Sequence, residues 1–202
     1  MIITIILHWI GTHGYEGQSY LKDVAVYMKC ENNIWTPITE ISGYTRAGGK
    51  DIDVDNSNLP HTVWRQKHPS GDPAEDSTMY RYFNGNNWTI PELIVEDPRE
   101  QQIIIDNYNK PNIFDVEKTE EGSILIHYYK NQDYWVGYII DNSEWNVLHS
   151  VVHNKNNKLY AAYIKPLSSA NSNIAMSVSK IITHNNLIAY TLKTKIYPNP
   201  FN

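Results

Sequence analysis

The residues of this chain whose types suit ligand chemistry gather in one segment. The candidate ligand-facing residues there are Arg46, Asp51, Asp53, His61, Trp64 and Arg65. A glycosidase works with two carboxylates at a defined separation, one as proton donor and one as nucleophile or base. The sequence does not measure that separation, so no catalytic residue is assigned. The segment also begins with a glycine-containing stretch, residues 44–49, and such connections often carry binding residues.

Metal chemistry is the next possibility that the residue types raise. Asp51, Asp53 and Asp55 alternate like the start of a calcium loop, but the sixth position is not glycine and the twelfth is not glutamate. In a strand these three side chains simply share one face. His149 and His153 lie four apart, the first expected in a strand and the second in a turn. We therefore expect no metal site and no cofactor, with calcium kept as the minor alternative.

Composition excludes several classes of function. The formal net charge of -5 and the absence of a Lys/Arg cluster argue against a nucleic-acid partner. Residues 1–7 are apolar but too short to span a bilayer, so we expect a strand there and no transmembrane segment. Cys30 is the single cysteine, which excludes an internal disulfide and predicts an inert strand residue.

Three stretches of the chain, residues 27–35, 80–88 and 127–135, can be superposed. Each reads as a strand, a polar turn and a tryptophan that opens the next strand. A repeat of this kind indicates an array of similar units. A side chain that recurs in every unit maintains the unit, whereas an unrepeated one is free to have a function. The residues between 46 and 65 stand out because most of them are unrepeated.

The complete second unit predicts four strands, at residues 50–55, 61–66, 78–83 and 88–95. Its first two strands are joined by a D-N-x-N-x-P turn at Asp55, which recurs at Asp106. A third unit follows at residues 102–140. A fourth has strands at 145–152, 158–165, 173–180 and 187–193, with a turn at 153–157. Four-stranded antiparallel sheets repeated about every 50 residues are typical of β-propeller blades.

The predicted fold class is therefore all-β, a β-propeller fragment of about three and a half four-stranded antiparallel blades. The expected blades cover residues 1–43, 44–97, 98–142 and 143–193, and residues 194–202 are expected to form a linker. The first unit lacks its opening strand. We expect the true start of the protein, with any signal peptide, to lie upstream.

Two resemblances add to this interpretation. The N-x-W-T-x-P-x-x-I phrase at residues 33–41, with a related phrase at 87–94, resembles blades of the sialidase-like, BNR-type propellers. The Asp-box of that family, S/T-x-D-x-G-x-x-W, is not found in this sequence. The tail K-I-Y-P-N-P-F-N at 195–202 resembles the opening of the C-terminal sorting domain of the type IX (Por) secretion system. That resemblance implies contact with the secretion machinery and a secreted or cell-surface protein.

Two functions from different classes remain open. The first is a propeller module of a secreted or surface bacterial protein that binds an extracellular glycan or protein through loops between blades. The second is a propeller glycoside hydrolase, sialidase-like, or a polysaccharide lyase, with its active site only partly in this chain. Whether the chain is an enzyme is left open. Fold alone does not decide between them, because one fold serves many functions.

Overall fold

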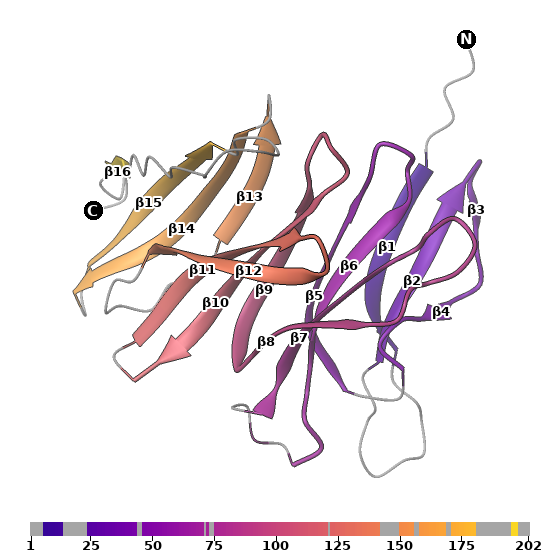
Figure 1. Ribbon diagram of the computed structural model, residues 1–202, viewed down its shortest axis with the longest axis horizontal. Helices are drawn as coiled ribbons and strands as arrows, with labels where there is room; N and C mark the ends of the chain where they lie inside the picture. The colour runs from indigo at the N-terminus through magenta and orange to yellow at the C-terminus, as the bar shows by residue number, and fades with distance from the viewer. Residues whose placement is uncertain are drawn as a thin grey trace. The chain divides into compact units, whose positions relative to one another are not determined.

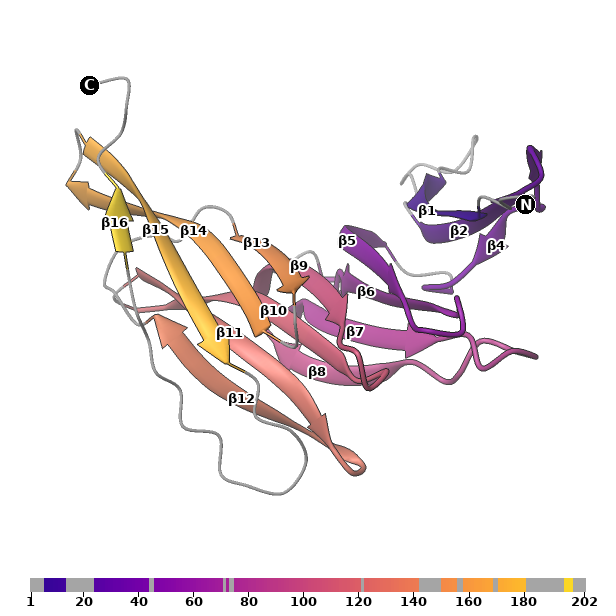
Figure 2. The same cartoon turned by 90° about the horizontal axis from the view of Figure 1, so that it is seen from above.

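The computed structural model describes residues 6–13, 24–43, 46–70, 72, 75–120, 122–141, 150–155, 158–168, 171–180 and 195–197. The chain divides into two compact units, residues 1–101 and 102–202, and each is described by itself. The regular elements of the described residues are β-strands, arranged in four sheets (Figures 1 and 2). None of these residues belongs to a helix long and apolar enough to cross a membrane.

The first unit contains two sheets. One has the order β1-β2-β3, with β4 also paired to β2, and consists of β1 (Ile6–His13), β2 (Val24–Glu31), β3 (Ile34–Trp35) and β4 (Thr39–Glu40). The other has the order β5-β6-β7-β8 and consists of β5 (Ala47–Val54), β6 (Pro60–Gln66), β7 (Ser77–Tyr82) and β8 (Glu92–Glu96).

The other two sheets are built in the same order. One comprises β9 (Pro98–Ile105), β10 (Pro111–Thr119), β11 (Gly122–Asn131) and β12 (Tyr134–Asp141), and the division between the units falls within β9. The last comprises β13 (Ser150–Lys155), β14 (Lys158–Ser168), β15 (Asn171–Lys180) and β16 (Lys195–Tyr197). The prediction of an all-β protein with four-stranded antiparallel blades is confirmed.

The three superposed stretches have the same strand register. Trp35 pairs with Cys30, Trp88 with Phe83, and Trp135 with Lys130. By this register β2 corresponds to β7. Because β1 pairs with β2 as β6 pairs with β7, β1 corresponds to β6. Among the described residues the first sheet accordingly has no counterpart of β5, and its outer strand is split into β3 and β4.

The split of the outer strand follows from the W-T phrase and the proline behind it. The Thr36 amide donates to the Lys29 carbonyl at 2.8 Å, while its hydroxyl accepts the Lys29 amide at 3.0 Å. Thr89 makes the same two bonds to Tyr82, at 2.9 and 3.1 Å. The threonine hydroxyl thus replaces a ladder carbonyl where proline interrupts pairing. Valine follows Trp135 instead, and β12 continues without a break.

The two D-N-x-N-x-P turns are built alike. Asp55 Oδ1 accepts the amides of Ser57 and Leu59 at 2.9 and 2.8 Å. Asp106 Oδ1 accepts those of Tyr108 and Lys110, both at 2.8 Å. Asn58 and Asn109 have φ values of 59° and 60°, the left-handed conformation that asparagine tolerates. Asp55 and Asp106 thus cap two backbone amides each, and the predicted recurrence of the turn is confirmed.

Replacing either turn aspartate by alanine is expected to lower the free energy of unfolding by about 1–2 kcal/mol, because two backbone amides lose their acceptor. Asp→Asn keeps Oδ1 and should cost less. Urea unfolding of D55A, D106A and the matched turn variant S57A measures the effect. An alanine variant as stable as S57A would contradict this account of the turns.

Each unit has its own apolar core. In the first unit Ala25, Tyr27, Ile41, Ala47 and Trp64 form a buried cluster, with Ile10, Ile52, Met79 and Trp88 packed against it. In the second unit the cluster consists of Phe114, Val116, Leu125, Ile140 and Leu159, with Ile104 packed against it. Alternate residues of β2 (Ala25 and Tyr27) and of β10 (Phe114 and Val116) belong to these clusters, as a period of two requires.

The structure differs from the predicted elements in several places, one of which is the start of β5 at Ala47 and not at residue 50. β8 begins at Glu92, with only an isolated bridge at Trp88, because Thr89 and Pro91 interrupt the ladder. His153 lies in β13 opposite Tyr160 and not in a turn, because β13 extends to Lys155. Lys195–Tyr197, expected in the linker, pair with β15 as β16. His149 and the strand predicted at 187–193 lie outside the described residues.

Candidate functional site

The β5–β8 sheet carries polar residues where the β9–β12 sheet carries apolar ones. In the register that the shared turns define, Asp53, Arg65 and Thr78 correspond to Ile104, Val116 and Leu125. The latter three belong to the apolar core of the second unit. Cross-strand pairing of Asp53 with His61 and of Arg65 with Thr78 puts the polar residues on one face of the sheet. An unrepeated polar face is the first requirement for a site in an array.

Arg65 is held by a buried carboxylate. Its Nε donates to Asp76 Oδ2 at 2.8 Å, and Asp76 Oδ1 accepts the His68 amide at 2.9 Å. Asp76 is 2% exposed, so its charge is compensated by Arg65 and by a backbone donor. The guanidinium is thereby fixed at the end of the sheet where β5 begins.

The start of β5 is irregular at that same end. Ala47 pairs with Gln66 and Lys50 with Trp64, so Gly48 and Gly49 together oppose the single residue Arg65. This is a β-bulge, a feature that often lies beside active sites. The exposed residue before it, Arg46, accepts the Lys67 amide on its carbonyl at 2.8 Å. Arg46, the bulge and Arg65 are thus neighbours, and we call this group of residues the bulge end.

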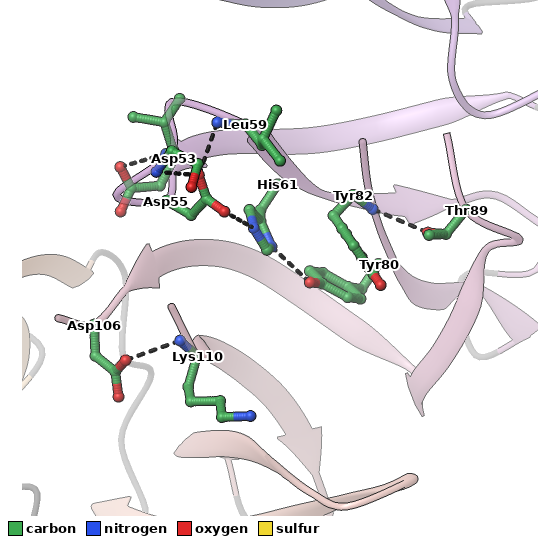
Figure 3. A network of polar contacts seen from close by, with 11 residues as sticks. Asp53, Asp55, Leu59, His61, Tyr80, Tyr82, Thr89, Asp106 and Lys110 are labelled. Carbon is green, nitrogen blue, oxygen red and sulfur yellow. Dashed lines mark hydrogen bonds and ion pairs between the residues drawn. The ribbon is translucent and has the colours of Figure 1, made fainter. Parts of the chain in front are cut away.

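A second polar group lies at the opposite end of β5, beside the Asp55 turn. The Tyr80 hydroxyl is 2.7 Å from His61 Nδ1, while His61 Nε2 lies 4.0 Å from Asp55 Oδ2 (Figure 3). The Tyr82 ring stacks on the His61 imidazole at 5.2 Å between centroids. Asp53 Oδ1 accepts the Val54 amide at 2.8 Å. The carboxylate beside Nε2 favours a proton on that nitrogen, so Nδ1 accepts the Tyr80 O–H.

Burial controls the protonation of this second group. It lowers the pKa of His61 to about 4, although Asp55 acts in the opposite direction. Burial also raises the pKa of Tyr80, with further contributions from Glu92, Tyr82 and Asp55. At neutral pH both side chains are uncharged. The pair therefore offers hydrogen bonding and no charged acid or base.

The next sheet contains a counterpart of this pair with other residue types. Asn112 and His127 occupy the positions of His61 and Tyr80, and His127 Nε2 lies 2.9 Å from Asn112 Oδ1. The Asn112 Nδ2 donates to the Lys110 carbonyl at 3.0 Å, so Oδ1 is the acceptor and His127 carries its proton on Nε2. Because this bridge recurs, the His61–Tyr80 pair belongs to the framework of the blade.

The predicted ligand-facing residues do not form one cluster. A β-strand rises about 3.3 Å per residue, so Arg46 at one end of β5 lies about 20 Å from Asp53 at the other. Arg46 and Arg65 belong to the bulge end, His61 and Asp53 lie beside the turn, and Asp51 is between them. The inclusion of Trp64 is corrected: it is 0% exposed and packs in the core on the opposite face.

One residue that the sequence analysis did not select lies against the bulge. Gln101 is 5% exposed, and within the described residues neither its Oε1 nor its Nε2 has a hydrogen-bond partner. A buried polar group without a partner costs about 1–3 kcal/mol. A Cβ added to Gly49 would lie 3.2 Å from Gln101 Oε1, so the amide rests on bare backbone. Only the alignment of Gln101 with Lys50 in β5 could have drawn attention to it.

The described residues contain no group of three or more His, Cys, Asp and Glu side chains that could hold a metal ion. The Asp51-Asp53-Asp55 alternation is used locally. Asp51 Oδ1 accepts the Ile52 amide at 2.9 Å, and Asp55 Oδ1 is occupied by its turn.

Comparisons with known proteins bear on the fold. No protein-family model and no curated protein sequence matches the chain. Among solved structures, an alpha-L-arabinanase of Penicillium chrysogenum complexed with arabinobiose matches 76% of this chain at 10% identity with a TM-score of 0.50. The GH43 protein BlXynB of Bacillus licheniformis matches 98% at 11% identity with a TM-score of 0.51. The matched parts are 50% and 40% of those chains, so this chain spans half of their length or less. The chain has the β-propeller fold.

Proposed function

We propose that this chain is a carbohydrate-binding propeller module whose ligand contacts the bulge end, formed by Arg46, Gly48, Gly49 and Arg65. The observation that carries the proposal is the unrepeated polar face of the β5–β8 sheet, where the corresponding residues of the next sheet build an apolar core. The Arg65 side chain of this face keeps 20% of its surface exposed while it pairs with Asp76, so a ligand can reach it. The likeness in fold to GH43 proteins supports the choice of carbohydrate.

The bulge end has the chemistry that a sugar ligand requires. Arginine offers several N–H donors in a fixed plane to ligand oxygens. Arg46 is exposed, and Arg65 is held in place by Asp76. The bare backbone of Gly48 and Gly49 allows close approach of a ring. These groups would hold hydroxyl oxygens without any metal.

Replacing Arg46 by alanine is expected to weaken glycan binding about tenfold, roughly 1.4 kcal/mol for the loss of a charge-assisted hydrogen bond. The measurement is a glycan array that includes arabinan and xylan oligosaccharides, followed by titration calorimetry of the best binder and of arabinobiose. Lys110→Ala, which removes an exposed cation from the Asp106 turn, is the control. Equal affinity of R46A and wild type would remove Arg46 from the site, and an array without binding would refute the function.

A glycoside hydrolase or polysaccharide lyase is the second candidate. Asp51 and Asp53 lie two residues apart on one face of β5, so their Cα atoms are about 7 Å apart, a spacing that two carboxylates of an inverting glycosidase could span. Release of reducing ends from arabinan, lost in D53N and D51N, would favour this function. Glycan binding without turnover would favour the binding module.

We further propose that the intact protein is secreted or held at the bacterial cell surface. The support is the tail at 195–202, which resembles the start of a type IX sorting domain. The W-T phrases separately resemble sialidase-like blades. An extracellular glycan or protein is then the expected partner. Fractionation of the native bacterium tests this, because a protein confined to the cytosol would contradict it.

A further inference from the structure

The carboxamide of Gln101 has no structural task in the described part of the chain. Its side chain is 5% exposed, and neither amide atom has a partner among the described residues. Buried amides in native proteins are almost always hydrogen-bonded. An amide without a partner among the described residues is available to a group outside them.

The backbone of Gly49 lies beside this amide. Gly49 faces Gln101 Oε1, and any Cβ there would approach the oxygen to 3.2 Å. A Cβ added to Gly48 would lie 3.4 Å from Lys67 Cε and 3.7 Å from Arg65 Cβ. Gly49 thus presents bare backbone to the amide, and a side chain at this position would crowd Oε1.

Charge decides which kind of ligand suits this place. The Arg65 guanidinium, on the residue opposite the bulge, already pairs with Asp76, so this ion pair adds no net charge. A carboxamide is neutral and combines one acceptor oxygen with two N–H donors. Two neighbouring hydroxyl groups, one donating and one accepting, match it, whereas a carboxylate or phosphate would leave Oε1 without a donor.

We propose that the Gln101 carboxamide, beside the Gly48–Gly49 bulge, binds a pair of neighbouring hydroxyl groups of a neutral saccharide. This inference rests on the proposed carbohydrate-binding function. It assigns to Gln101 the hydrogen bonds to the sugar hydroxyls. Gln101 Oε1 accepts one hydroxyl and Nε2 donates to the next.

The test is Gln101→Leu, which keeps the size of the side chain and removes both polar atoms. Affinity for arabinobiose and for the best oligosaccharide of the array is expected to fall at least tenfold, about 1.4 kcal/mol. The melting temperature should stay equal or rise, because no framework hydrogen bond is lost. Gly49→Ala, which displaces Oε1, should also weaken binding. Gln102→Leu, the same substitution at the next residue of β9, is the matched control and should bind like wild type.

The outcomes separate this inference from the function on which it rests. Glycan binding by wild type with affinity unchanged in Q101L overturns the role of Gln101 and leaves the function standing. A loss of affinity in Q101L that accompanies a lower melting temperature identifies the amide as a framework group and also overturns the inference. No binding by wild type to any glycan, arabinobiose included, overturns both.

Discussion

Replacing Trp64 by alanine is expected to lower the free energy of unfolding by about 3–5 kcal/mol, the usual cost of deleting a fully buried large aromatic side chain. Trp64 is 0% exposed and lies in the cluster with Ala25, Tyr27 and Ile41. The loss combines the transfer free energy of the indole with an unfilled cavity. The loss is a large part of the roughly 5–15 kcal/mol that stabilises a typical domain, so W64A should unfold at a much lower urea concentration than wild type.

Urea unfolding followed by circular dichroism measures this effect. Trp35→Ala is the matched control, because Trp35 is 47% exposed and its removal should cost about 1 kcal/mol or less. Trp64→Phe should cost much less than alanine. Phenylalanine keeps part of the aromatic contact, and within the described residues the indole Nε1 has no partner to lose. Similar losses in W64A and W35A would contradict the assigned core.

The protein is expected to lose stability steeply as the pH falls below 6.5. Burial lowers the pKa of His127 to about 3 and that of His61 to about 4 in the folded chain, against about 6.5 for a solvated histidine. Between 6.5 and these values the unfolded chain binds protons that the folded chain does not. Each histidine then contributes up to about 1.4 kcal/mol per pH unit, so the two together account for up to about 5 kcal/mol between pH 6.5 and 4.5. Above pH 6.5 this contribution is fully present.

Urea titrations at pH 7.5, 6.0 and 4.5 test this expectation. His127→Gln keeps an N–H donor for Asn112 Oδ1 but does not titrate, so its stability should fall with pH about half as steeply as that of wild type. The variant should also be less stable at pH 7.5, because the ring stacked on Phe114 at 4.7 Å is lost. A wild-type stability independent of pH over this range would refute buried, neutral histidines.

Much of the fold followed from local patterns. The pairing of Cys30 with Trp35, of Phe83 with Trp88 and of Lys130 with Trp135 reproduces the alignment of the three stretches. Alternation of apolar residues and turn chemistry act over a few residues, so they are visible in the sequence. The boundary of β8 was missed, since it depends on a threonine hydroxyl replacing a carbonyl of the facing strand.

The candidate site could be predicted only in part. Asp53 and Arg65 were selected because they are unrepeated, and the structure places them on one face of the sheet. Trp64 was selected for its residue type. It lies at an alternate position of β6 from Arg65, so its side chain faces the core. Arg46 and His61 are separated by the length of a strand. Chain position alone does not tell the face or the end of a sheet at which a side chain lies.

The sequence by itself determined the array: the strands, the Asp55 and Asp106 turns, and the tryptophan register, because each arises from hydrogen bonds and apolar alternation between neighbours in the chain. Only the tertiary structure decided which polar residues are engaged. Arg65 pairs with Asp76, and His61 forms a hydrogen bond with Tyr80. The Gln101 amide has no partner among the described residues. Hydrogen-bond satisfaction depends on atoms brought together across strands, and that information appears only once the sheets are formed.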